Sequence, residues 1–255
     1  MNTTADITDG NHEQLIAIVA HELRYPLVPI RNAAALLRQD SPDSTTIRRA
    51  AEIIERQASG MNRMISDLVD VSRMQLGAME IKPLRAELAA LVELAIESAG
   101  PLSGERGLTL SVSVSPEPVY LNMDVLRLSQ ALHHMITNAI KYSDKYGYIR
   151  VRAQRDGAQA VVVVTDTGIG IPEAELERIF GLFAQSARGP RVEPGLGLGL
   201  YLARHLIEAH GGTVTAASDG SGRGSVFTVR LPCEVPATRA NEPADAEPAG
   251  DLSPA

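Results

Sequence analysis

Two neighbouring stretches of helical periodicity near the start of the chain constrain its fold more than any other feature. In each stretch, apolar residues recur alternately three and four positions apart, the spacing of a helix that packs on another helix. The first seam, between residues 11 and 39, contains Val19, Leu23, Pro26, Ile30, Ala33 and Leu37. The second contains Ile47, Ala51, Ile54, Ala58, Met61, Ile65 and Leu68. Two such helices joined by a short turn predict an αα-hairpin over residues 11–78.

Local signals define the ends and bends of these two helices. Pro26 and Pro29 lie inside the first, and each removes a backbone donor and favours a bend. Ser41 is the predicted N-cap of the second helix, with Pro42 at its first position, and Gly77 is its predicted end. A single hairpin buries little apolar surface, so we expect two copies to form a dimeric four-helix bundle, which makes the protein a homodimer.

The pattern changes after Lys82-Pro83, where helical and strand-like segments begin to alternate. The expected helices cover residues 86–99, 124–142 and 197–210. The expected strands cover residues 108–114, 119–121, 148–154, 160–166, 213–218 and 225–231, with a turn at Asp156-Gly157. A short helix and a mobile polar stretch are expected within residues 171–194. This mixture predicts an α+β sandwich over residues 84–232, flanked by a flexible segment at 1–10 and a disordered tail at 233–255.

The bulk composition argues against several classes of protein. The net charge of −7 argues against nucleic acid as the main partner. The single cysteine, Cys233, rules out an internal disulfide and fits a reducing compartment. No apolar run approaches the roughly 20 residues that span a bilayer, and residues 1–10 lack the features of a secretory signal. We therefore expect a cytoplasmic protein that does not insert into a membrane.

His21 lies in the first helical stretch, on the face opposite the apolar seam. Its side chain is expected to face solvent, with the carboxylate of Glu22 next to it in sequence. Taken alone, one exposed histidine is an ordinary solvated surface residue. Whether His21 has a chemical function depends on three segments further along the chain.

The first of these segments is Asp166-Thr167-Gly168-Ile169-Gly170, which directly follows an apolar strand. Glycines two positions apart let a backbone approach a ligand closely, and an aspartate at a strand end can accept a hydrogen bond from an exocyclic amine. An ordinary strand-to-loop turn would look the same, and the segment alone leaves both interpretations open.

The second segment is Gly195-Leu196-Gly197-Leu198-Gly199-Leu200, which opens a predicted helix. Backbone donors at a helix N-terminus favour phosphate, and glycines let it come near. The segment is neither a P-loop nor a well-formed dinucleotide fingerprint, and a flexible lid hinge would have the same glycines.

The third segment is the helix at 124–142, where Asn138 and Lys141 lie three positions apart on neighbouring faces. A carboxamide oxygen can bind Mg²⁺, and an ammonium group can pair with phosphate. A polar rim on an amphipathic helix is the alternative for either residue alone.

Together, the order and spacing of these segments resemble the two-component sensor histidine kinases. His21-Glu22-Leu23-Arg24-Tyr25-Pro26-Leu27 resembles the H box of that family, and Leu132 to Lys141 resembles the N box. Asp166 to Gly170 resembles the G1 box, Phe180-Gly181-Leu182-Phe183 the F box and Gly195 to Leu200 the G2 box. The resemblance covers roughly residues 11–232. It implies a dimerisation and histidine-phosphotransfer hairpin followed by a Bergerat-type ATP-binding domain.

The resemblance also implies a role for each motif residue in binding ATP and Mg²⁺. Asp166 would accept from the adenine amine, with Gly168, Gly170 and Tyr142 near the base. Asn138 would hold Mg²⁺ across the phosphates, and Lys141 would offset their charge. The remaining nucleotide-binding residues implied are Gly195, Gly197 and Gly199, which give the phosphates backbone donors, and Phe180 and Phe183, which pin a lid to the domain body.

His21 would then attack the γ-phosphate, with Glu22 taking or orienting its proton, and the phosphoryl group would pass to an aspartate of a response regulator. Two positions depart from the family pattern. Tyr25 stands where the family usually has Thr or Asn, which puts phosphatase activity in doubt. His134 stands where asparagine is frequent, so metal coordination can differ.

Two other functions compete with a histidine kinase. A pseudokinase scaffold would bind a regulator or another kinase without transferring phosphate, and Tyr25 and His134 are the features that favour it. Another ATPase of the same superfamily, such as a chaperone, a topoisomerase or a serine kinase, does not need the hairpin that carries His21.

Overall fold

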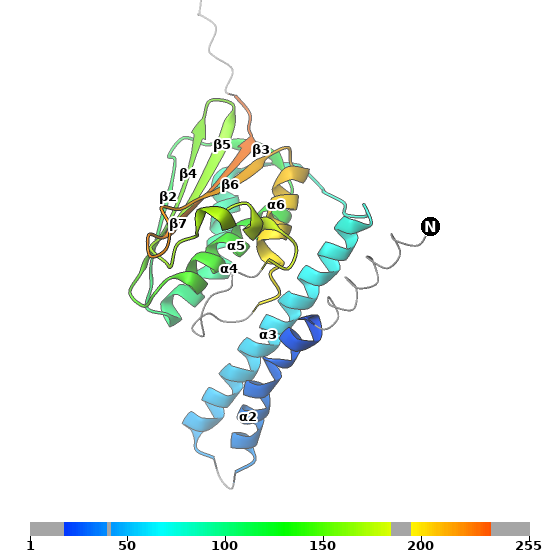
Figure 1. Cartoon of the computed structure of the whole chain (residues 1–255), viewed down its shortest axis with the longest axis vertical. Coiled ribbons are helices and arrows are strands. Elements are labelled where there is room, and N and C mark those ends of the chain that lie inside the picture. The colour runs from blue at the N-terminus through cyan, green and yellow to red at the C-terminus, as the bar shows by residue number, and fades with distance from the viewer. Residues whose placement is uncertain (1–17, 40–41, 185–194, 236–255) are drawn as a thin grey trace, which may run out of the picture.

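The computed structural model describes residues 18–39, 42–184 and 195–235 (Figure 1). It consists of a long helical hairpin and a sheet domain packed against one end of it. The expectations of a flexible segment at 1–10, an N-cap at Ser41 and a mobile stretch reaching residue 194 fall wholly or partly outside the described residues.

The hairpin pairs α2 (Leu27–Leu37) with α3 (Ser44–Gln75). Residues 18–24 are also helical, but a turn at Tyr25 and Pro26 separates them from α2. The expected continuous helix is therefore broken where a bend was predicted, because Pro26 cannot donate to the helical ladder. Pro29 lies in the first turn of α2, where a missing N–H is tolerated.

The start of α3 corrects the expected cap. The helix begins at Ser44, and Asp43 is its N-cap, with a side-chain oxygen that accepts from the backbone N–H of Thr46 at 2.6 Å. Pro42 precedes the helix and is not its first residue. Serine and aspartate are both good caps, so the local sequence did not determine which one starts the helix. Gly77, with φ of 64°, follows the end of α3 as predicted.

The sheet domain is a mixed α+β sandwich, which confirms the predicted class. Its five-stranded sheet has the order β2-β4-β5-β7-β6, and only the β2–β4 pair is parallel. The strands are β2 (Thr109–Val114), β4 (Tyr148–Asp156), β5 (Gln159–Asp166), β7 (Ser225–Pro232) and β6 (Thr213–Ala217). The helices α4 (Leu88–Glu105), α5 (Val125–Tyr142) and α6 (Gly199–Ala209) cover one face of this sheet (Figure 1).

A second, two-stranded sheet corrects another expectation. β1 (Leu84–Glu87) pairs antiparallel with β3 (Tyr120–Met123), so residues 86 and 87 are strand and not the start of a helix. α4 also continues past Ala99 to Glu105. Ala99 and Ser103 are buried, so packing against the domain core stabilises this last part of the helix.

The domain extends past the last expected strand. The backbone N–H of Glu234 donates to the carbonyl of Tyr120 at 2.8 Å, and its carboxylate accepts from Arg85 Nε at 2.8 Å. Residues 233–235 therefore belong to the folded part, and the rest of the expected tail lies outside the described residues. Between residues 171 and 184 the structure has two short 3₁₀ turns, η1 (Glu173–Glu175) and η2 (Arg178–Phe180), in place of the expected helix.

The hairpin and the sheet domain meet where α3 packs beside α5 and α6. Asp70 of α3 is buried, and its Oδ2 accepts from Arg127 Nη1 at 2.8 Å and from Gln130 Nε2 at 2.9 Å. No helix in the described ranges is both long enough and apolar enough to cross a bilayer.

Candidate functional site

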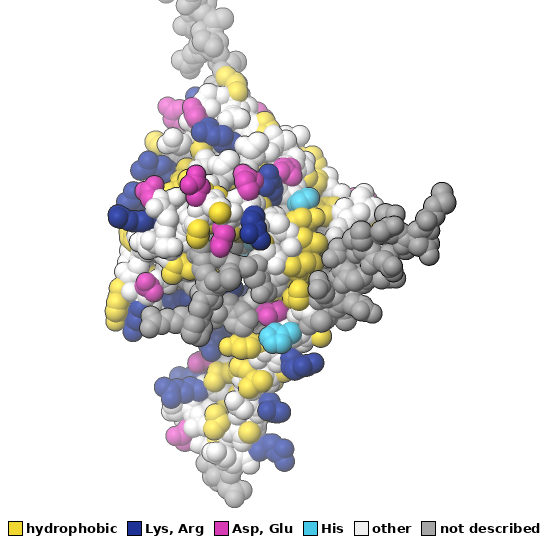
Figure 2. Space-filling model, in the orientation of Figure 1, with side chains coloured by type: hydrophobic (Ala, Val, Ile, Leu, Met, Phe, Trp, Pro, Cys, Tyr) yellow, Lys and Arg dark blue, Asp and Glu magenta, His cyan; other side chains and the backbone are white. Residues whose placement is uncertain are grey.

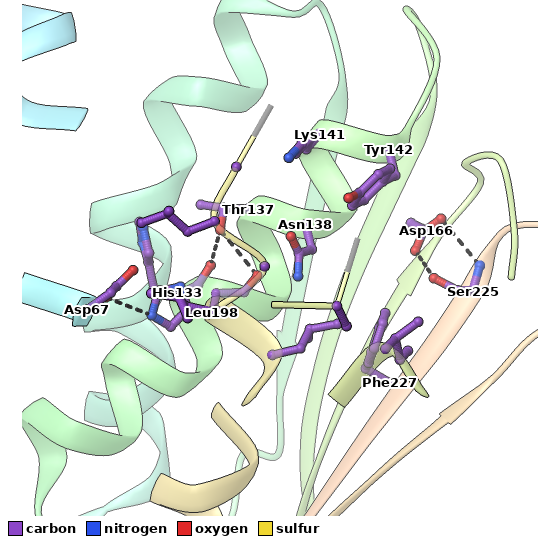
Figure 3. A pocket seen from close by; sticks show the side chains of 18 of the residues that line it. Asp67, His133, Thr137, Asn138, Lys141, Tyr142, Asp166, Leu198, Ser225 and Phe227 are labelled. Carbon is purple, nitrogen blue, oxygen red and sulfur yellow. Dashed lines mark hydrogen bonds and ion pairs between the residues drawn. The ribbon is translucent and has the colours of Figure 1, made fainter. Parts of the chain in front are cut away.

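A cavity of about 410 Å³ opens between α5, the loop after β5, the start of α6 and the middle of α3 (Figure 3). It brings together most of the predicted ligand-binding residues, although they are spread over some sixty positions of the chain. Those that line it are Asn138, Lys141, Tyr142, Asp166, Gly170, Gly195, Gly197 and Gly199. Gly168, Phe180 and Phe183 lie outside its wall, and so do His21 and Glu22.

Asp166 forms one end of the cavity, at the last position of β5. Its Oδ1 accepts from the backbone N–H of Gly168 at 2.8 Å and of Ser225 at 3.3 Å, and its Oδ2 accepts from the hydroxyl of Ser225. Burial raises the pKa of Asp166 above its ordinary value, and the hydrogen bonds from Ser225 and Gly168 oppose that shift. The result is a buried carboxylate held in place by three hydrogen bonds.

Ser225 was missed by the sequence analysis. It lines the cavity and is the direct partner of Asp166 in the β5–β7 ladder. Only the register of two strands that lie far apart in sequence places it there, and no local pattern signals it.

The two glycines after Asp166 act differently. Gly170 lines the cavity with φ of 67°, a conformation that favours glycine. Gly168 packs against the end of α5, where a Cβ would collide with the carbonyl of Tyr142. That carbonyl also accepts from the N–H of Ile169 at 3.0 Å. Gly168 thus lets the loop dock on α5, and its proximity to a bound base stays a prediction.

Asn138, Lys141 and Tyr142 project from the cavity-facing side of α5. The opposite side of this helix is core, and it contains Leu128, Ala131, Leu132, Met135, Ile136, Ala139 and Ile140. In Figure 3 the Asn138 amide points into the middle of the cavity, with Lys141 and Tyr142 one turn further along. The ammonium of Lys141 lies 3.1 Å from the position that a Cβ on Gly195 would take. The Lys141 ammonium therefore lies beside residues 195–200, the glycine segment.

The glycine segment ends in the N-terminus of α6, which begins at Gly199 without a side-chain cap. Leu196 and Leu198 are buried and anchor the segment to the domain. Gly197 has φ of 67°, and a Cβ there would lie 2.7 Å from the carbonyl oxygen of Ala184. An uncapped helix N-terminus beside a lysine attracts an anion.

The two phenylalanines of the predicted F box support the cavity from outside. Phe180 is buried, and its ring meets the edge of Phe227 at 6.3 Å between centroids. Phe227 lines the cavity, so Phe180 braces its floor. Phe183 is partly buried and has φ of 59°. The lid that both were expected to pin falls at least partly within residues 185–194, which lie outside the described residues.

One wall of the cavity comes from the hairpin and was not expected. Gly60, Arg63, Met64 and Asp67 of α3 line the cavity. Figure 3 shows Asp67 on the side opposite Asp166. Asp67 Oδ1 lies 3.3 Å from His134 Nε2, an ionic contact when the imidazole is protonated. The neighbouring His133 is held neutral, because burial, His134 and Arg63 lower its pKa to about 4.

His21 and Glu22 lie on the helical segment before the turn at Tyr25. The His21 side chain is 74% exposed and that of Glu22 is 7% exposed, and Nδ1 of His21 lies 3.3 Å from Oε1 of Glu22. The predicted exposure of His21 is therefore observed. Tyr25 is 56% exposed.

Comparison with known proteins identifies the class of protein to which these two domains belong. Residues 11–77 match the model of the His Kinase A (phospho-acceptor) domain, and residues 123–235 match that of the histidine kinase-, DNA gyrase B-, and HSP90-like ATPases. A phospho-acceptor hairpin followed by such an ATPase domain is the catalytic core of a sensor histidine kinase. The chain therefore contains the catalytic core of a sensor histidine kinase.

Relatives of known name agree with this assignment. The adaptive-response sensory kinase SasA of a Synechococcus species is 32% identical over 224 residues, 86% of this chain and 59% of SasA. Hybrid signal transduction histidine kinase D of Dictyostelium discoideum is also 32% identical, over 86% of this chain and 14% of the relative. The chain spans less than two thirds of the length of these relatives.

Solved structures share the fold. Full-length ShkA in complex with AMPPNP has a TM-score of 0.62 at 27% identity, over 89% of this chain and 47% of ShkA. ThkA in complex with the response regulator TrrA has a TM-score of 0.59 at 22% identity, over 86% of this chain and 61% of ThkA, and shows the fold alone.

Proposed function

We propose that the chain is an ATP-dependent protein-histidine kinase that phosphorylates its own His21 and passes the phosphoryl group to an aspartate of a response regulator. One observation carries the proposal. A single cavity contains a buried acceptor, an amide, a lysine and a glycine-rich helix N-terminus, in a chain that also exposes a histidine beside a buried carboxylate. The complex of ShkA with AMPPNP supports the choice of ATP as the ligand.

ATP would lie along the cavity with its base at Asp166 and its phosphates at the glycine segment. Asp166 accepts from the adenine amine, and Ser225 orients the carboxylate. The ammonium of Lys141 and the first N–H groups of α6 offset the phosphate charge. Tyr142 and Gly170 flank the base.

The donor set fits Mg²⁺ held mainly by the nucleotide. Magnesium is usually bound through one or two protein ligands together with substrate phosphates and water. The described residues contain no group of three acidic, histidine or cysteine side chains that would form a cage, and Asn138 offers one carboxamide oxygen at the centre of the cavity. When bound, Mg²⁺ would neutralise the charge that develops on the phosphates.

The transfer step needs His21 and the cavity to approach each other, because His21 does not line the cavity. A ring nitrogen of His21 attacks the γ-phosphorus, the bond to the oxygen of ADP breaks, and the ring proton passes to Glu22. The protein contributes mainly positioning and charge neutralisation to such a reaction.

The hairpin supports both proposed partners. Ile47 and Ile65 of the predicted second seam are each 47% exposed, which is what a second copy in a four-helix bundle would cover. Figure 2 shows hydrophobic side chains on the hairpin between basic ones. The exposed His21 and Tyr25 leave room for a response regulator, such as the one with which ThkA forms a complex. The net charge of −7 argues against a nucleic acid.

Two finer points complete the proposal. We infer a location in the cytoplasm, which the lone cysteine supports. Phosphatase activity is weak or absent, because Tyr25 places a large ring where the family resemblance implies a small polar residue. A pseudokinase scaffold remains the second candidate, and Tyr25 and His134 favour it.

Incubation with γ-labelled ATP tests the proposal. Label on this chain that is lost in acid and stable in base identifies a phosphohistidine. An unlabelled chain would favour the scaffold, and acid-stable label would indicate a different kinase chemistry.

A further inference from the structure

The wall that the hairpin contributes to the cavity carries one carboxylate, that of Asp67, together with the guanidinium of Arg63. Asp67 and Asp166 stand at opposite ends of the labelled residues in Figure 3, with Asn138 between them. The proposed adenine site is at Asp166, so Asp67 faces the terminal phosphates. A carboxylate and a neighbouring phosphate chain repel each other unless a cation lies between them.

His134 connects Asp67 to the glycine segment. Its Nε2 is buried under Asp67, 3.3 Å from Oδ1, in a geometry that makes no hydrogen bond. On the other side of the ring, a Cβ on Gly199 would lie 2.9 Å from Nδ1, so the imidazole packs against the first residue of α6. One side chain thus touches both the hairpin and the helix N-terminus proposed to bind phosphate.

We propose that Asp67 is an interdomain gate whose contact with His134 and the terminal phosphates of ATP exclude each other. With Asp67 on His134, the hairpin closes the phosphate end of the cavity. Bound ATP displaces the carboxylate, leaves His134 Nε2 facing the phosphates and loosens α3 from the sheet domain. This inference rests on the proposed function, because it requires ATP in this cavity.

A second contact explains why displacement of Asp67 does not release the hairpin entirely. Asp70 lies three residues further along α3 and pairs with Arg127 and Gln130, outside the cavity. Of these two contacts, the one made by Asp67 lies at the cavity and competes with nucleotide, whereas the one made by Asp70 does not. A ligand shifts such an equilibrium by the difference between its affinities for the two arrangements, and that difference depends here on the phosphate chain.

Binding of Mg-ATP and of AMP to the full chain tests the gate by calorimetric titration. Asp67→Asn keeps the size of the side chain and removes its charge. We expect it to tighten Mg-ATP binding about fivefold, the lower end of typical coupling between sites, and to leave AMP binding nearly unchanged. Glu55→Gln removes an equal charge from an exposed position of α3 outside the cavity and should change neither affinity.

A double-mutant cycle supplies an independent readout. The melting temperatures of Asp67→Asn, His134→Asn and the double variant should be non-additive without nucleotide and additive at saturating Mg-ATP. Equal Mg-ATP affinity in Asp67→Asn and the unaltered chain would overturn the gate, as would equal tightening for AMP or coupling that persists at saturating ATP. Weaker Mg-ATP binding would also overturn it and make Asp67 a metal ligand. If the unaltered chain binds no Mg-ATP, the proposed function itself fails.

Discussion

Nδ1 of His21 lies 3.3 Å from the carboxylate of Glu22, yet the histidine side chain is 74% exposed and the glutamate side chain is 7% exposed. The buried carboxylate is a fixed point against which the exposed ring is oriented. With Nδ1 turned toward Glu22, Nε2 is the ring nitrogen that faces away from that contact. In the proposed mechanism, the pair would combine a proton acceptor held by the fold with a nucleophile accessible to a second domain.

Replacing Glu22 by Gln should slow autophosphorylation without affecting nucleotide binding. A positioned general base typically contributes about a hundred- to ten-thousand-fold to the rate, and we expect a loss in that range. The initial rate of labelling from γ-labelled ATP measures it. Glu55→Gln, on an exposed part of α3, is the matched control, and an unchanged rate in Glu22→Gln would remove Glu22 from the mechanism.

Asn138→Ala should abolish most of the stabilisation that Mg-ATP gives to the folded chain. A ligand at about a hundred times its dissociation constant stabilises by about 2.7 kcal/mol, and we expect the variant to lose the larger part of this. Melting curves with and without Mg-ATP give the shift. Asn122→Ala, at an exposed position of β3, should keep it. A full shift in Asn138→Ala would contradict the proposed role.

The site could be predicted from the sequence only where a motif is local. Residue type and spacing are enough to predict the G1 segment, Asn138 and the glycines before α6. The structure brings these residues into one cavity. Ser225 and Asp67 could not be found in this way. Ser225 reaches Asp166 through strand register, and Asp67 reaches the cavity through the packing of α3 on the sheet domain.

The fold, too, could be predicted from the sequence only where a pattern is local or extends over many residues. The long helices follow from seams that extend over many turns, whereas β1 has four residues with no alternation of burial and is fixed by its pairing with β3. The tie between Glu234 and Arg85 likewise joins residues far apart in sequence, and it moves the end of the domain beyond the expected strand.

The hydrogen bond from Ser225 predicts a pH effect on nucleotide binding. Burial raises the pKa of Asp166 and the Ser225 hydroxyl lowers it, so Ser225→Ala should raise the pKa further. Because the ionised carboxylate is the better acceptor for the adenine amine, ATP affinity should begin to fall at a higher pH in the variant as the pH is lowered. Affinities measured across the acidic range give the two midpoints, with Ser113→Ala on β2 as control. Coincident midpoints would contradict this account.

The raised pKa of Asp166 also makes the free energy of unfolding depend on pH in a defined direction. The folded state binds the Asp166 proton more tightly than the unfolded state, in which the pKa of the carboxyl is the ordinary 3.8. The free energy of unfolding therefore falls as the pH rises from that value to the raised pKa, and the penalty persists above it. In Ser225→Ala this window should extend to higher pH.

Tyr25→Thr should confer or increase phosphatase activity. Tyr25 is 56% exposed and follows His21 by four residues at the turn before α2, so its ring occupies the surface that a regulator would meet. The assay mixes a phosphorylated receiver domain with each protein and ADP and follows the loss of label. Rapid loss with the unaltered chain would show that Tyr25 does not prevent dephosphorylation.

The most direct test of the central claim is the mapping of label on the chain after incubation with γ-labelled ATP and magnesium. The account predicts acid-labile label on His21, no label on His21→Ala, and an unchanged melting shift with Mg-ATP in that variant. His205→Ala, which alters a ring tilted against Tyr201 outside the cavity, should remain labelled. Label retained by His21→Ala would contradict the assignment of His21 as the phosphoryl acceptor.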